Sequence, residues 1–441
     1  MQMVSTEASP APTLSFAYML CGTLGMLAAG LLLAWQPEAL LTRWHPAALA
    51  AVHLFALGGL MPVMLGALLQ FMPVACGLAL PGKVWLESLI LGGLMAGAGL
   101  LAAGFLSGSA GAMAAAGALL LTSLSVAGLR LARALWRQPR ANALQAALRR
   151  STLALGMTMG FGAALLGILI AGWNLPLVIL VDWHALWGIA GWVGGLIGSV
   201  ATVVVPMFHV SKPYPGHWNL ALRTLPWLLL TGSAAALSGF GSTATVASLM
   251  LAALVALFGG LTAQRVWASQ RGERDAFFWG WLGVALLSVA LGGLGATAAL
   301  ASDPRWGTAF GLLALAGLGG STLNVMLYRI VPFLIWLHWQ RANKARARLP
   351  LLHQIVPERW QRTQLAADLL AILLLLGACF APALTRPAAL LFAASKLVLL
   401  VSLARAMQGY REKLAHLKTL PAASPRAAPE PDCPAPKVAI A

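Results

Sequence analysis

Hydrophobic residues in this chain are gathered into long runs that polar or basic stretches separate. Each run holds about twenty residues or more, the length at which an α-helix crosses the hydrocarbon core of a bilayer. The pattern predicts an all-α, polytopic membrane protein with twelve transmembrane helices. We expect these helices at residues 14–36, 47–75, 83–106, 109–133, 152–174, 180–208, 218–238, 243–268, 276–300, 306–338, 363–385 and 387–408.

An internal repeat is visible in the second, sixth and tenth of these helices. They contain Pro73, Pro206 and Pro332, which are 133 and 126 residues apart, and a glycine-rich stretch precedes each proline. The spacing predicts three pseudo-repeated units of four helices. The alternative is that Gly and Pro are simply common in membrane helices.

The two ends of the chain differ from the apolar runs. Residues 1–13 are polar and lack the basic start of a cleavable signal sequence, so we expect the first apolar run to remain as a membrane span. Residues 409–441 are rich in Pro and Ala, and their composition cannot build a core. We therefore expect a transmembrane domain over residues 14–408, flanked by a short N-terminal segment and a disordered tail.

Charged residues are sparse and unevenly placed. They make up 9% of the chain, against about a quarter of a soluble domain. The formal net charge is +17, yet most Lys and Arg residues fall on one side of the predicted helices. This positive-inside pattern indicates insertion into a lipid bilayer, not nucleic-acid binding. It predicts a bacterial inner (plasma) membrane protein with both termini in the cytoplasm.

Two histidines fall inside apolar runs. His53 precedes Pro73 by 20 residues and His184 precedes Pro206 by 22, a difference of roughly 3 Å in depth along a helix. An unpaired polar group in hydrocarbon costs several kcal/mol, so both rings need partners. Haem b held between the two helices is one answer, since imidazole is a common axial ligand. Hydrogen bonding between helices and another metal, such as copper, remain alternatives.

Neighbouring residues bear on this site. Gly58 and Gly188 lie about one turn beyond the two histidines and are expected to give a cofactor room. Asp182, two residues before His184, is expected to cap the start of its helix.

The architecture resembles the catalytic subunit of the haem–copper oxidases, including the nitric oxide reductases. The shared features are twelve spans in three four-helix units, cytoplasmic termini, and a histidine in helix 2 followed by glycines. The resemblance implies a low-spin haem ligand at His53. It places His184 on the helix that carries a copper-binding histidine in that family. It also implies that Arg386, between helices 11 and 12, faces a haem propionate.

The chain departs from that family at the oxygen- or nitric-oxide-reducing centre. Helix 10 holds Phe310, Gly311 and Leu312 at the level where the family has His-x-His, and the run Trp218–Trp227 of helix 7 has no histidine. We therefore expect the binuclear centre to be absent. A haem, if present, would be held by His53 and His184.

Three classes of function follow. The first is a membrane haem protein for electron transfer or gas/redox sensing in respiration or denitrification. It would have a redox partner and no oxygen or nitric oxide reduction of its own. An enzyme of this kind would be an oxidoreductase. The second is a transporter or channel that uses Lys396 and Asp368, which lie inside helices 12 and 11 and can otherwise simply pair. The third is a cofactor-free assembly or accessory protein.

Overall fold

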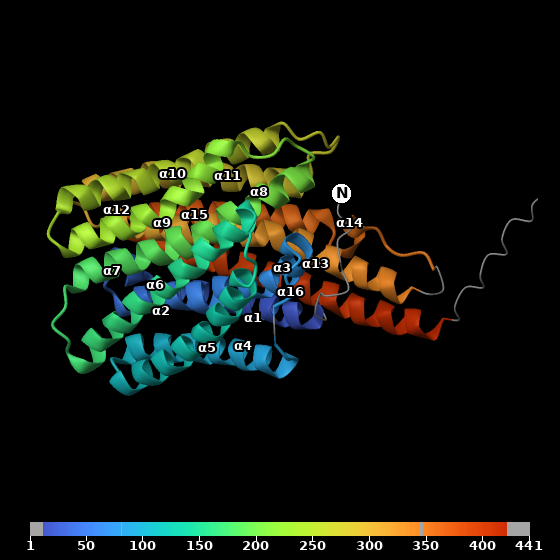
Figure 1. The fold of residues 1–441 in the computed structure, drawn as a ribbon. Coiled ribbons are helices and arrows are strands. Elements are labelled where there is room, and N and C mark those ends of the chain that lie inside the picture. Colours follow the sequence, from blue (N-terminus) through green and yellow to red (C-terminus); the bar gives the residue numbers. More distant parts are fainter. Residues whose placement is uncertain (1–11, 81, 344–346, 421–441) are drawn as a thin grey trace, which may run out of the picture.

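A computed structural model describes residues 12–80, 82–343 and 347–420. Within these residues, twelve helical spans are long and apolar enough to cross a membrane, and they pack side by side in one bundle (Figure 1). The all-α, multi-pass fold predicted from the sequence is therefore confirmed. The spans are Pro12–Trp35 (α1), Pro46–Cys76 (α2, η2, α3), Val84–Ser107 (α4), Ala110–Trp136 (α5), Ala143–Ala171 (α6), Leu177–His209 (α7, η3, α8), Gly216–Leu237 (α9), Gly241–Trp267 (α10), Ala276–Leu300 (α11), Arg305–Ala342 (α12, η4, α13), Glu358–Ala378 (α15) and Pro382–Thr419 (η5, α16).

A repeated change in helical geometry marks the second helix of each unit. The chain is π-helical over Leu54–Leu60 (η2), Trp187–Gly194 (η3) and Leu313–Gly320 (η4). Each π-helical segment begins nineteen residues before the proline of its span, so the segments repeat at the same intervals as the prolines. π-Helical turns are rare. Three of them at equivalent positions confirm the predicted threefold repeat.

The three π-helical spans meet in the middle of the bundle. A Cβ placed on Gly319 of η4 would lie 3.0 Å from Leu60 Cδ1 of η2 and 3.5 Å from Val193 Cγ1 of η3. A Cβ here would be tight against Leu60 and in ordinary contact with Val193, so glycine lets the three spans approach closely. The second, sixth and tenth spans therefore form the centre around which the other helices are arranged.

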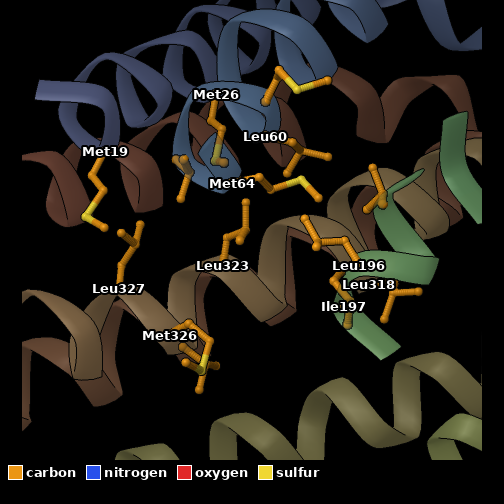
Figure 2. Packing of buried hydrophobic residues seen from close by; sticks show 14 of the residues in the cluster. Met19, Met26, Leu60, Met64, Leu196, Ile197, Leu318, Leu323, Met326 and Leu327 are labelled. Atoms are coloured by element: carbon orange, nitrogen blue, oxygen red, sulfur yellow. The ribbon is translucent and has the colours of Figure 1, made fainter. Parts of the chain in front are cut away.

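Methionine and leucine side chains fill this centre (Figure 2). Flexible thioethers suit irregular gaps between helices, so these methionines are explained as core residues. The labelled side chains belong to one buried cluster and come from four spans: Met19, Met26, Leu60, Met64, Leu196, Ile197, Leu318, Leu323, Met326 and Leu327.

Two helices extend beyond their predicted limits. α6 begins at Ala143 instead of residue 152, because Asn142 and Gln145 form a capping box that starts the helix within the basic stretch. α16 continues to Thr419, so residues 409–419 are helical, and their assignment to a disordered tail was wrong. Tyr410 explains the extension, since its side chain is buried and its carbonyl oxygen accepts a hydrogen bond from Trp339 Nε1 (3.2 Å).

Two further limits differ from the prediction. α15 covers residues 358–378 instead of 363–385, because Pro357 allows the helix to start one turn earlier. Residues 1–11 of the predicted N-terminal segment, and 421–441 of the predicted tail, lie outside the described residues.

Candidate functional site

A cavity of about 1110 Å³ lies among the spans, and His53 and His184 both line it. Its walls are mostly apolar and come from all three units, so the repeated helices together enclose it. This volume lies just above the roughly 300–1,000 Å³ of typical ligand pockets, so the cavity has room for a cofactor-sized ligand.

The two histidines come from equivalent parts of consecutive units. His53 is the last residue of α2, directly before η2, and His184 lies in α7, three residues before η3. The centroids of their rings are 6.3 Å apart, and the ring planes differ by 20°. The two histidines that the sequence places at similar depths therefore lie next to each other, with their imidazole rings nearly parallel.

Hydrogen bonds fix the tautomer of each ring. His53 Nδ1 lies 2.7 Å from the carbonyl oxygen of Leu49, and His184 Nδ1 lies 3.1 Å from that of Thr158. A carbonyl oxygen only accepts, so Nδ1 carries the proton in both neutral rings. Each Nε2 keeps its lone pair, and within the described residues it forms no hydrogen bond. This is the arrangement of metal-binding histidines, whose second nitrogen donates to a carbonyl group.

The spacing of the rings fits a shared metal ion. Bonds of about 2 Å from a metal to two imidazole nitrogens on opposite sides place the ring centroids about 6 Å apart. A direct hydrogen bond between two neutral rings would need a donor, and neither Nε2 carries a proton. The two histidines therefore do not hydrogen-bond to each other. The bond from His184 to the carbonyl oxygen of Thr158 does join α7 to α6, so the alternative of hydrogen bonding between helices applies to His184.

Neither a family model nor a curated protein matches this chain. Its function must therefore be inferred from the geometry of the cavity and its polar groups. In addition to the histidines, the indole of Trp192 lines the cavity, and its buried Nε1 has no hydrogen-bond partner in the described part of the chain. Because that nitrogen is itself buried, the two imidazoles remain the candidate ligand groups of the cavity.

Glycines shape the site: Gly188 lines the cavity as expected from the sequence, whereas Gly58 does not. Gly58 packs against α1, since a Cβ on Gly25 would lie 2.2 Å from the Gly58 carbonyl oxygen. Gly188 faces Thr158 and lines the cavity. The glycine closest to a histidine is Gly162 of α6, where a Cβ would lie 3.2 Å from His184 Cε1. Gly58 therefore serves helix packing, while Gly162 gives the imidazole its space.

An ion pair closes one side of the cavity. Arg43, between η1 (Pro37–Leu41) and α2, pairs with Asp182 of α7, and both residues line the cavity. α7 begins at Leu177, so Asp182 lies inside the helix, and its predicted role as a cap was wrong. The pair joins the first unit to the second beside the two histidines.

Arg386 lies near this end of the bundle but is not among the residues that line the cavity. Its Nε donates to the carbonyl oxygen of Ala34 (3.3 Å) at the end of α1. In the third unit, Phe310 and Leu312 line the cavity.

The predicted pairing of Lys396 with Asp368 is confirmed. Lys396 Nζ lies 2.6 Å from Asp368 Oδ1, and the two residues are 0% and 1% exposed. The pair connects α16 to α15, and Asn324 Nδ2 of α13 donates to the other carboxylate oxygen (2.8 Å). It is therefore a buried polar centre, separate from the histidines.

Proposed function

We propose that this protein binds one haem b between the second and sixth spans, with His53 and His184 as its axial ligands. The observation that carries the proposal is the pair of imidazoles at 6.3 Å with both Nδ1 atoms hydrogen-bonded to carbonyl oxygens. The apolar cavity supports it, since a porphyrin presents mainly apolar surface.

The ligand set favours electron transfer over catalysis. Haem iron supplies a one-electron redox couple. With both histidines as ligands, a bound haem would have no position free for oxygen or nitric oxide. We therefore propose electron transfer or redox sensing linked to respiration or denitrification. Sensing of a gas would require one histidine to leave the iron.

Arginines at the rim of the cavity are proposed to hold the propionates. Guanidinium groups match the geometry of carboxylates. Arg43 is placed for this role by its position on the cavity wall, where Asp182 orients it. Arg386, proposed from the family resemblance, is a second partner from the same end of the bundle.

We propose a divergent relationship with the haem–copper oxidases, on the basis of twelve spans in three units. The basic loops then place both ends of the transmembrane domain in the bacterial cytoplasm. Reporter fusions at Arg140 and Arg348 are expected to report a cytoplasmic location, and a fusion at Arg305 an external one. A fusion at Arg140 that reports an external location would contradict this orientation.

The proposed function is tested by the absorption spectrum of the protein purified after expression with ample haem. We expect a Soret band and a stoichiometry of one haem b per chain. A transporter or a cofactor-free accessory protein would show no such band. The specific observation that favours a transporter is the fully buried Lys396–Asp368 pair, so the absence of haem would make that the leading function.

A further inference from the structure

The buried polar centre around Asp368 contains two acceptors that have no donor among the described residues. The carboxylate accepts from Lys396 Nζ (2.6 Å), Ser395 Oγ (2.8 Å) and Asn324 Nδ2 (2.8 Å). Asn324 Oδ1 and Gln364 Oε1 have no donor in the described part of the chain, although both residues are 0% exposed. Unpaired acceptors at this depth cost several kcal/mol, so water molecules are expected to supply the missing donors.

The polar groups continue from this centre toward the end of the bundle where α15 begins. Gln364 lies one turn before Asp368 on α15, and its Nε2 donates to Ser395 Oγ (3.2 Å). Gln361, a further turn toward that end, is only partly buried and donates to the carbonyl oxygen of Val356 (2.8 Å). These side chains are polar groups at successive turns of α15, between its start and Asp368.

No other charge packs against the pair among the described residues. The helices α1 and α11 and the segment η4 carry no charged side chain. Tyr18 and Cys21 are the ionisable groups of α1, and Tyr18 donates to Glu87 instead. The charges of the other neighbouring elements, α12, α13 and η1, lie near the ends of the bundle, at Arg305, Arg329, Arg341 and Glu38. Tyr328 of α13 is the nearest further ionisable group.

One aromatic ring separates the pair from the cavity. Lys396 Nζ lies 4.5 Å from the centroid of the Phe392 ring, and Phe392 lines the cavity. The ring of Phe55, two residues after His53, is 6.0 Å from that of Phe392. A change of charge in the cavity therefore acts on the pair through low-dielectric material, where electrostatic interactions are strong.

We propose that Asp368 and Lys396 form a proton-binding site, supplied through Gln364, whose occupancy is linked to the redox state of the cofactor. This inference rests on the proposed haem. In the oxidised state one proton is shared between the Lys396 amine and the Asp368 carboxylate. The net charge of the pair is then zero. When an external donor supplies one electron, the pair takes up a second proton from the α15 end. The gain of one positive charge then balances the electron.

The proposal is tested by redox titration of the intact protein at several pH values. Over the range where the pair titrates, the midpoint potential is expected to fall with rising pH, by up to about 59 mV for each tenfold change in proton concentration. The double variant Lys396→Met/Asp368→Leu should keep the haem spectrum and lose this dependence. The control Glu87→Gln/Arg130→Gln removes a different ion pair and should leave the dependence unchanged.

A second measurement follows the carboxyl group directly. The reduced-minus-oxidised infrared spectrum should show a protonated carboxyl band, which Asp368→Asn removes. A midpoint potential of the wild-type protein that does not change with pH, or a dependence that persists in the double variant, would overturn the proposal while leaving the haem in place. Absence of haem would overturn the proposed function and this inference together.

Discussion

His53→Ala and His184→Ala are each expected to abolish the low-spin haem spectrum while the protein still inserts into the membrane. Each substitution removes one of two imidazoles whose rings are 6.3 Å apart, so the iron loses one axial ligand. We expect a high-spin spectrum or a loss of bound haem of about tenfold or more, since even partners of metal ligands contribute tenfold to a hundredfold to affinity. Absorption spectroscopy of equal amounts of purified protein measures both effects.

His45→Ala is the matched control for these variants. His45 lies at the start of the same helix, where its Nδ1 accepts a hydrogen bond from the backbone of Ala47 (3.2 Å), and it does not line the cavity. Its substitution should leave the spectrum unchanged, whereas imidazole added to His53→Ala should restore the low-spin form. A low-spin spectrum that persists in both His53→Ala and His184→Ala would show that other residues bind the haem.

Asp368→Ala is expected to lower the free energy of unfolding by about 3–5 kcal/mol, the usual cost of removing one partner of a buried ion pair. The variant leaves the Lys396 ammonium in the membrane interior without a carboxylate, and Ser395 and Asn324 lose their acceptor. Unfolding of the purified protein with increasing denaturing detergent measures the change.

The double variant Lys396→Met/Asp368→Leu should recover most of this loss, since it leaves no isolated charge. Asp303→Ala removes a carboxylate that pairs with Arg305 on the exposed surface, and it should change stability little because such pairs are screened by solvent. If the double variant loses as much free energy of unfolding as Asp368→Ala, the uncompensated charge is not the cause of that loss.

The helix count and the threefold repeat could be predicted because both depend on features spaced regularly along the chain. Pro73, Pro206 and Pro332 recur at intervals that the π-helical segments also follow. The π-helical geometry itself has no sequence signal that distinguishes it from an α-helix. The start of α6 was missed because its capping box lies in a basic stretch that also suits a loop.

The candidate site was predicted only as far as depth along a helix allows. His53 and His184 could be matched because a proline follows each of them at a similar distance. The ion pair between Arg43 and Asp182 could not be predicted, since the two residues are 139 positions apart and meet only in the packed bundle. The role of Gly162 depends on how α6 lies against α7, which the pattern of apolar residues does not determine.

The claim that two parallel imidazoles hold one haem is tested most directly by the electron paramagnetic resonance spectrum of the oxidised protein at low temperature. Two histidines whose ring planes differ by 20° predict a single low-spin ferric species with the rhombic signal that near-parallel axial ligands give. The signal should account for one haem per chain. A purely high-spin signal, a low-spin signal typical of perpendicular ligand planes, or no haem signal from protein expressed with ample haem would contradict the claim.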